Sequence, residues 1–213
     1  MGTRNLIGVI LNNEVKLAQY GQWDGYFTGQ GSGVVDFILG HLNTPKGLDR
    51  FKRRLQKCSW YTPEEIKEIW TKYGAKGGLI EYHLANQLGE DYPALDRDTG
   101  SEILNLVYTG KITKLQNEWE FGGESLFCEY AYVLDLDNQI LEIYVGFNKK
   151  PLGPTERFKD IPFKKREGDI YYQVRLYKKV LFKDLTKDYM KQISQELSDE
   201  DEKAEPLRTN SNK

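Results

Sequence analysis

The chain has 213 residues, of which 39% are hydrophobic and 13% aromatic, so it can bury a substantial core within the usual size of one domain. Its 30 basic and 32 acidic residues leave a formal net charge of −2, which excludes the overall basic field that draws a protein onto nucleic acid or an anionic membrane. Cys58 and Cys128 are too few for a disulfide framework and predict two small buried side chains.

The cysteines and histidines are also isolated from one another, without the paired spacing of a zinc site. We therefore expect no metal and no cofactor. No apolar run approaches the length of a membrane span, and no basic segment followed by an apolar run resembles a signal peptide. These features predict a cytoplasmic protein without a membrane partner.

The N-terminal region predicts a β-hairpin followed by a glycine-rich segment. Residues 3–11 are rich in β-branched and aliphatic side chains, an Asn-rich turn follows at 12–14, and residues 15–20 alternate as a returning strand. After the glycines, apolar residues at helical spacing predict a helix that begins near Ser32.

Residues 45–108 have a helical pattern throughout. Thr62 and Pro63 are typical of the start of a helix. Residues 79–88 suit a short helix. A further helix is expected to begin at Asp98 and to end at Gly110.

The C-terminal half changes to the period of strands. Residues 127–134 and 140–145 flank a turn, residues 170–182 alternate as a third strand, and residues 185–197 suit a closing helix. The whole predicts one α+β domain, residues 1–197, with antiparallel strands forming one sheet that helices cover. Residues 198–213 are charged and poor in apolar groups, so we expect them to be disordered.

The segment 18–31, AQYGQWDGYFTGQG, is the first candidate site. Glycines allow close approach to the backbone, and amides, an acid and aromatic rings between them are typical of a pocket for a small polar molecule. The candidate ligand-binding residues here are Gln19, Tyr20, Gln22, Trp23, Asp24, Tyr26 and Gln30. The alternative is a structural connection in which Trp23 and Tyr26 fill the core.

A second candidate is Arg97, which lies between Asp96 and Asp98 and could hold a carboxylate or phosphate. The alternative gives Asp98 the role of a helix cap, with Asp96 and Arg97 as a surface pair.

Two other clusters have simpler interpretations. Asp135 and Asp137 suit a turn better than a metal site, because the spacing of a calcium loop is missing. The basic residues between 149 and 166 alternate with phenylalanines, as in single-strand binding, but interspersed acids favour a solvated loop. We therefore do not expect a nucleic-acid partner.

Several segments resemble a family of uncharacterised proteins from phages, bacteria and fungi. The similar segments are GTRNLI at 2–7, AQYGQWDGY at 18–26 with GQG at 29–31, YPALDRDTGSEIL at 92–104 and EYAYVLDLDNQILEIY at 129–144. The resemblance extends to about residue 182 and implies no assigned activity.

The N-terminal hairpin is also distantly similar to the N-terminal nucleophile hydrolases, of the bile-acid amidase branch. That resemblance implies an amide hydrolase with Thr3 as the nucleophile after cleavage behind Gly2, Lys16 as an assisting cation and Asp24 at the end of the second strand. The likeness departs where the hydrolases carry a conserved arginine, because Gly21 stands there.

Three functional hypotheses follow. The leading one is a non-catalytic binding protein that holds a small polar ligand or a protein partner through the loop 18–31. The alternatives are the Thr3 amide hydrolase and a phage–host interaction or adaptor protein without a pocket.

Overall fold

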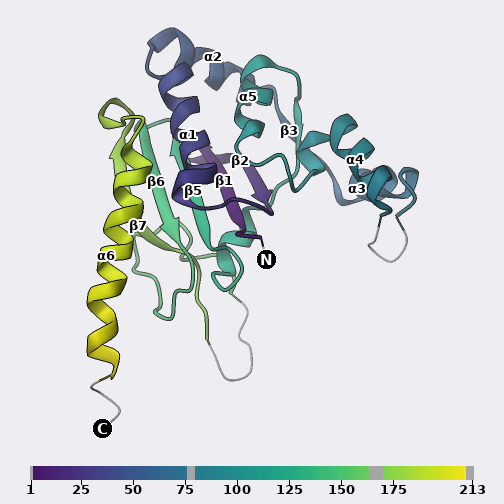
Figure 1. Ribbon diagram of the computed structural model, residues 1–213. Helices are drawn as coiled ribbons and strands as arrows, with labels where there is room; N and C mark the ends of the chain where they lie inside the picture. Colours follow the sequence, from purple (N-terminus) through teal and green to yellow (C-terminus); the bar gives the residue numbers. More distant parts are fainter. Residues whose placement is uncertain (1, 76–79, 164–169, 210–213) are drawn as a thin grey trace.

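The computed structural model describes residues 2–75, 80–163 and 170–209. Within them, five strands form one sheet in the order β2-β1-β5-β6-β7 (Figure 1). The strands of this sheet are β1 (Asn5–Leu11), β2 (Glu14–Gly21), β5 (Tyr130–Asp135), β6 (Ile140–Val145) and β7 (Arg175–Leu181). The N-terminal and C-terminal strands are therefore parts of the same sheet.

The predicted hairpin of β1 and β2 is confirmed. Its turn is stabilised by hydrogen bonds to a residue that lies far away in the sequence. Asn12 and Asn13 both have left-handed backbones, with φ of 55° and 59°, which asparagine tolerates better than most residues. The carboxylate of Asp137 accepts hydrogen bonds from both of their amide groups, at 3.0 and 2.8 Å. Asp137 thus joins the turns of the two hairpins.

The α+β class is confirmed, but the sheet is mixed rather than purely antiparallel. β1 lies beside β5 in parallel, from Asn5 opposite Tyr130 to Ile10 opposite Asp135. The pairs β1–β2, β5–β6 and β6–β7 are antiparallel, as expected. The parallel pair arises because the chain crosses over the sheet through its helical block before it returns.

Helices cover one face of the sheet. They are α1 (Ser32–Phe37), α2 (Pro45–Leu55), α5 (Glu102–Thr109) and α6 (Tyr189–Thr209). In Figure 1, α1 lies in front of the sheet, α6 runs along its β7 side and continues below it, and α2 and α5 lie at its upper end. Inward-facing residues of these helices and of the strands form the main core, which includes the fully buried Phe51, Leu104 and Tyr132.

Loops cover the other face, where the sequence analysis places no element. Trp119 stacks on Phe158 with ring centroids 4.5 Å apart, over a second core cluster. Gly8 on β1 leaves room for this indole, because a Cβ atom there would lie 2.7 Å from the Trp119 ring. A glycine in the central strand therefore has a packing role.

A smaller helical unit stands beside the β2 edge. It contains α3 (Pro63–Lys72) and α4 (Tyr82–Asp91), which pack around Tyr73, Leu88 and Leu95. Two short parallel strands, β3 (Ser59–Trp60) and β4 (Lys114–Leu115), join this unit to the body. Thr62 is the N-cap of α3, as the sequence predicts, and a capping box with Glu65 completes this helix start.

Several predicted boundaries differ from the structure. α5 begins at Glu102 and not at Asp98, although Gly110 ends it with a left-handed φ of 80°, as expected. The third C-terminal strand starts at Arg175 rather than at 170. The closing helix expected over residues 185–197 is α6, which begins at Tyr189.

A largely buried ionic cluster fastens a covering loop to the sheet. The Arg157 guanidinium donates hydrogen bonds to Glu142 at 2.5 Å and to Asp135 at 2.9 Å, and Glu142 also accepts from Tyr144 and Lys179. Burial would raise the pKa of both carboxyls, yet their hydrogen bonds and the Arg157 charge together lower the pKa of each.

We expect Arg157→Met to lower the free energy of unfolding by about 3 kcal/mol, because it leaves two buried carboxylates without their main partner. Lys179→Met is the matched control: its side chain is half exposed, and its loss should cost less than about 1 kcal/mol. Urea denaturation at neutral pH measures both. Equal losses would show that Arg157 is not the centre of the cluster.

The lowered pKa values also predict acid sensitivity. Carboxyls with folded pKa values below the unfolded ones, about 3.9 and 4.3, stabilise the fold above those values. That stability is lost as the pH falls through the lower, folded pKa values. Denaturation between pH 7 and pH 2 should show a steeper decline for the unmodified protein than for Arg157→Met, and parallel curves would contradict the assignment.

Candidate functional site

The two segments singled out by sequence, 18–31 and 92–100, lie side by side. The Gln19 side-chain amide donates to the carbonyl of Asp96 at 3.1 Å, and the Gln22 backbone amide donates to the carbonyl of Arg97 at 2.9 Å. The Gln30 side-chain oxygen accepts a hydrogen bond from the Ser101 amide at 2.7 Å. These bonds join the end of β2 to the segment that leads into α5.

The Ser101 bond also corrects the helix-cap interpretation of Asp98. Gln30, from a distant part of the sequence, satisfies an amide at the start of α5, while the Asp98 amide donates to the Asp96 carboxylate at 3.0 Å. A short-range capping pattern could not reveal this, because the acceptor is 71 positions away. Gln30 is therefore a structural residue.

Glycines in the loop permit close packing against the N-terminal residues. The Gly25 amide donates to the Thr3 carbonyl at 2.9 Å, and the Gly25 carbonyl accepts from the hydroxyl of the buried Tyr132 at 2.8 Å. A Cβ atom at Gly25 would lie 2.8 Å from the Thr3 carbonyl oxygen. Much of the glycine pattern thus serves the connection between strand and helix.

Trp23 and Tyr26 do not fill the core, because 45% and 49% of their surfaces are exposed. The Trp23 ring packs against the N-terminal segment, since a Cβ atom at Gly2 would lie 2.4 Å from it. Asp24, between them, is exposed and has a left-handed backbone with a φ of 54°. These three residues form an outer surface and do not line a cavity with Gln19 and Tyr20.

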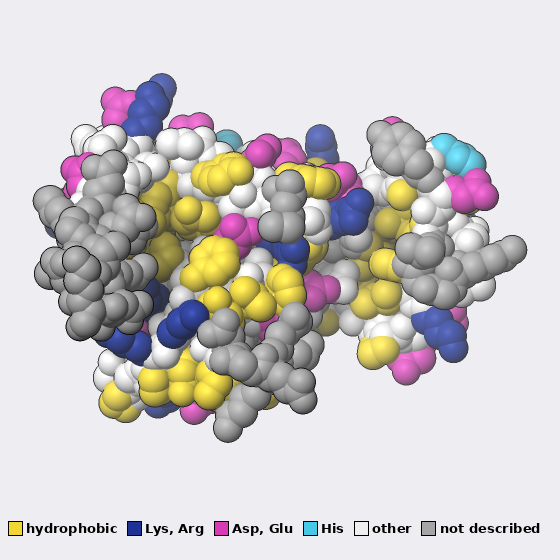
Figure 2. Space-filling view, turned by 60° about the horizontal axis from the view of Figure 1, so that its bottom comes forward, with side chains coloured by type: hydrophobic (Ala, Val, Ile, Leu, Met, Phe, Trp, Pro, Cys, Tyr) yellow, Lys and Arg dark blue, Asp and Glu magenta, His cyan; other side chains and the backbone are white. Residues whose placement is uncertain are grey.

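A groove of about 500 Å³ lies between the β2 edge and the helical unit, and we call it the β2–α4 groove. Its apolar lining comes from the helical unit and the segment after it, and consists of Trp70, Ile80, Ala85, Leu88 and Leu95. Its polar lining consists of Gln19, Tyr20, Asp96, Arg97, Gln116 and Glu118. Figure 2 shows the helical unit set apart at the right, with hydrophobic side chains facing the rest of the molecule.

The polar groups of this groove are partly withdrawn from water. Burial raises the pKa of the carboxyls of Asp96 and Glu118, and it raises the pKa of Tyr20 as well. The Tyr20 hydroxyl donates to the side-chain oxygen of Gln22. The Trp70 indole N–H is buried without a hydrogen-bond acceptor in the described part of the chain. An unpaired buried donor is uncommon in folded proteins.

The residues named for hydrolysis are not brought together. Thr3 is 6% exposed and precedes β1, whereas Lys16 lies near the opposite end of the hairpin, where it pairs with Glu14 at 2.5 Å. At the rise of a β-strand, this places the two residues on the order of 20 Å apart. Asp24 lies near Thr3 in the fold, but its side chain is exposed on the outer surface.

The groove contains residues that the sequence analysis does not single out. Trp70, Leu88 and Glu118 have no motif spacing and come from three separate segments. Only the docking of the helical unit onto the β2 edge places them near Gln19, Tyr20 and Arg97. A strand-edge glutamine followed by a tyrosine is the one local signal.

Within the described residues, no group of three or more His, Cys, Asp or Glu side chains is placed to hold a metal ion. None of the helices in that part of the chain is both long and apolar enough to cross a membrane. Comparison with models of known protein families, with characterised proteins and with solved structures finds no match to this chain.

Gln30→Ala should destabilise the fold by about 1 kcal/mol, because it removes the acceptor at the start of α5. Thr28→Ala is the control in the same loop, since Thr28 is exposed, and it should leave stability within about 0.5 kcal/mol. Chemical denaturation compares the two. Equal stabilities would mean that water replaces the Gln30 bond at no cost.

Proposed function

We propose that the protein is a non-catalytic binding protein whose β2–α4 groove takes a small, largely apolar molecule that carries an amine and a hydrogen-bond acceptor. One observation carries this proposal: the groove combines an apolar lining with the partly desolvated carboxyl groups of Asp96 and Glu118. Its volume of about 500 Å³ suits a small ligand.

The chemistry of the lining supports an amine. Carboxylates held partly away from water are stabilised by a nearby cation, so Asp96 and Glu118 favour a protonated amine between them. The rings of Trp70 and Tyr20 lie in the same groove and also attract a cation. The unpaired Trp70 indole N–H supports the second feature, an acceptor oxygen on the ligand.

The proposal narrows the set of ligand-binding residues that the sequence suggests. Gln19, Tyr20 and Arg97 remain, since all three line the groove. Gln22 and Gln30 hold the loop in place through Arg97 and Ser101.

The test compares 2-phenylethylamine with 2-phenylethanol, which has the same ring and chain length without the charge. We expect the amine to bind about tenfold more tightly, as one added charged hydrogen bond would give. Calorimetric titration at neutral pH measures both. Glu118→Gln should remove the preference while neutral binding remains.

A steric control separates the groove from the rest of the surface. Ala85→Trp fills the groove and should abolish binding, whereas Asn86→Trp adds the same ring at an exposed position on the same helix and should not. If both variants bind the amine like the parent, the groove is not the site.

The amide-hydrolase hypothesis predicts a different result. It requires a chain that starts at Thr3, so the intact mass of untagged protein expressed from the printed sequence would lack both Met1 and Gly2. A mass that retains Gly2 leaves Thr3 without a free amine and excludes that mechanism.

A further inference from the structure

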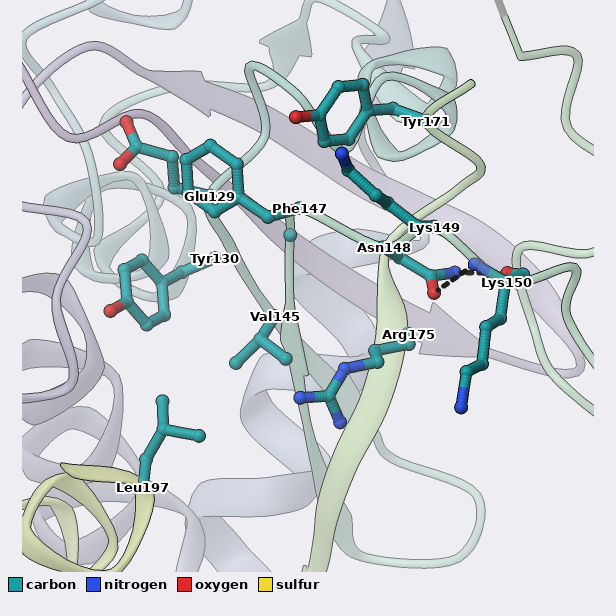
Figure 3. A pocket seen from close by; sticks show the side chains of 11 residues that line it. Glu129, Tyr130, Val145, Phe147, Asn148, Lys149, Lys150, Tyr171, Arg175 and Leu197 are labelled. Carbon is teal, nitrogen blue, oxygen red and sulfur yellow. Dashed lines mark hydrogen bonds between the residues drawn. The ribbon is translucent and has the colours of Figure 1, made fainter. Parts of the chain in front are cut away.

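A second and larger groove lies on the β7 side of the sheet, away from the β2–α4 groove. It begins where β6 ends, has a volume of about 1100 Å³, and we call it the Phe147 groove (Figure 3). Its aromatic residues are Tyr130, Phe147 and Tyr171. Its charged residues are Lys149, Lys150, Arg175 and Glu129.

A buried asparagine holds the walls of this groove together. Asn148 is 5% exposed, and its side-chain amide donates to the carbonyls of Lys150 at 2.7 Å and Gln173 at 3.0 Å. Its side-chain oxygen accepts from the Lys150 amide at 3.0 Å, and its backbone amide donates to the Ser125 hydroxyl at 3.1 Å. The segments that carry Lys150 and Tyr171 are therefore fixed relative to one another before any ligand arrives.

Phe147 is presented in an unusual way. Its ring is 56% exposed, and its backbone has a left-handed φ of 52°, which is unfavourable for a bulky residue. The conformation is held by a 2.7 Å hydrogen bond from its amide to the Ser125 carbonyl. Strain of this kind often accompanies binding sites, and here it keeps an aromatic ring turned outward.

The groove is locally basic although the chain as a whole is slightly acidic. Three cations and one carboxylate line it, and the Lys149 ammonium lies over the Tyr171 ring. Figure 3 shows the Arg175 guanidinium directed toward Val145, with Leu197 of α6 on the other side of the groove. In the described part of the chain, the side chains of Lys150 and Arg175 have no ion-pair partner. Both are available to an anion.

We propose that the Phe147 groove binds a nucleotide unit, with the base stacked on Phe147 and the phosphate held by Arg175 and Lys150. Guanidinium groups pair with phosphate oxygens through two parallel bonds, and aromatic rings stack on any base. A simple anion would need the cations alone, whereas the outward ring adds a surface for a planar partner. This local arrangement outweighs the net charge that argues against a nucleic-acid partner.

The experiment follows the fluorescence anisotropy of a labelled 15-mer of thymidine in low salt. We expect saturable binding that weakens as salt rises, with a logarithmic slope of roughly −1.4 for the two cations Arg175 and Lys150. Lys150→Glu combined with Arg175→Glu should weaken binding at least about tenfold. The matched double variant, Lys183→Glu with Lys187→Glu, reverses two exposed cations near the other end of β7 and should have no effect.

The stacking contribution is tested with Phe147→Gly. Glycine suits the left-handed backbone, so the variant should fold normally, which its thermal unfolding checks. Loss of one stacked base should weaken binding by about tenfold. If Phe147→Gly folds and binds the oligonucleotide like the parent, no base stacks on Phe147 and the proposal fails.

Competitors identify the ligand. Displacement by a nucleoside diphosphate or by an unlabelled 15-mer supports the proposal, and their relative strength shows whether one nucleotide or a strand is held. Equal displacement by inorganic polyphosphate, or equally strong binding to anionic phosphatidylserine vesicles, would overturn it. Ala85→Trp should leave oligonucleotide binding unchanged, so this proposal and that for the β2–α4 groove can fail separately.

Discussion

The structure depends on the parallel pairing of β1 with β5. β2 pairs with β1, β6 pairs with β5 and β7 pairs with β6, so the six residue pairs between β1 and β5 join the N-terminal hairpin to the three strands of the C-terminal half. Both faces of this central pair are buried, which explains why β1 is apolar at almost every position rather than alternating. The hydrogen bonds from the amides of Asn12 and Asn13 to Asp137 secure the same alignment at the turn end.

Local patterns predict the elements of this fold well, and long-range contacts much less well. The hairpin, the Thr62 helix start and the Gly110 helix end each depend on residues within a few positions of one another, and all are confirmed. The parallel central pair and the cap that Gln30 provides join residues 71 or more positions apart. No periodicity encodes such contacts. The loop-covered second face was missed for a similar reason, because Trp119 and Phe158 lie in irregular segments.

The candidate site shows the same division. The composition of segment 18–31 indicates a site, and its glycines and amides do make close contacts, but many of these contacts hold the fold together. The groove beside it needs a helical unit whose position the sequence does not reveal. The Phe147 groove lies where β5 and β7 begin and β6 ends, whereas the β2–α4 groove lies beside β2, so the two grooves are separate sites.

The edges of the sheet also determine how copies of the chain meet. β7 presents Arg175, Lys178 and Lys179 along its length, and its pairing with β6 shifts register between Ile143 and Tyr144. The edge of β2 is partly occupied, since Asn117 bridges to Ala18 and the Glu118 amide donates to the Ala18 carbonyl. Charged side chains on an edge strand and a segment that covers an edge are both features by which sheets avoid joining edge to edge, although Lys178 and Lys179 are themselves paired with Glu196 and Glu142. A second copy of the chain would therefore meet charged side chains at one edge of the sheet and a covering segment at the other.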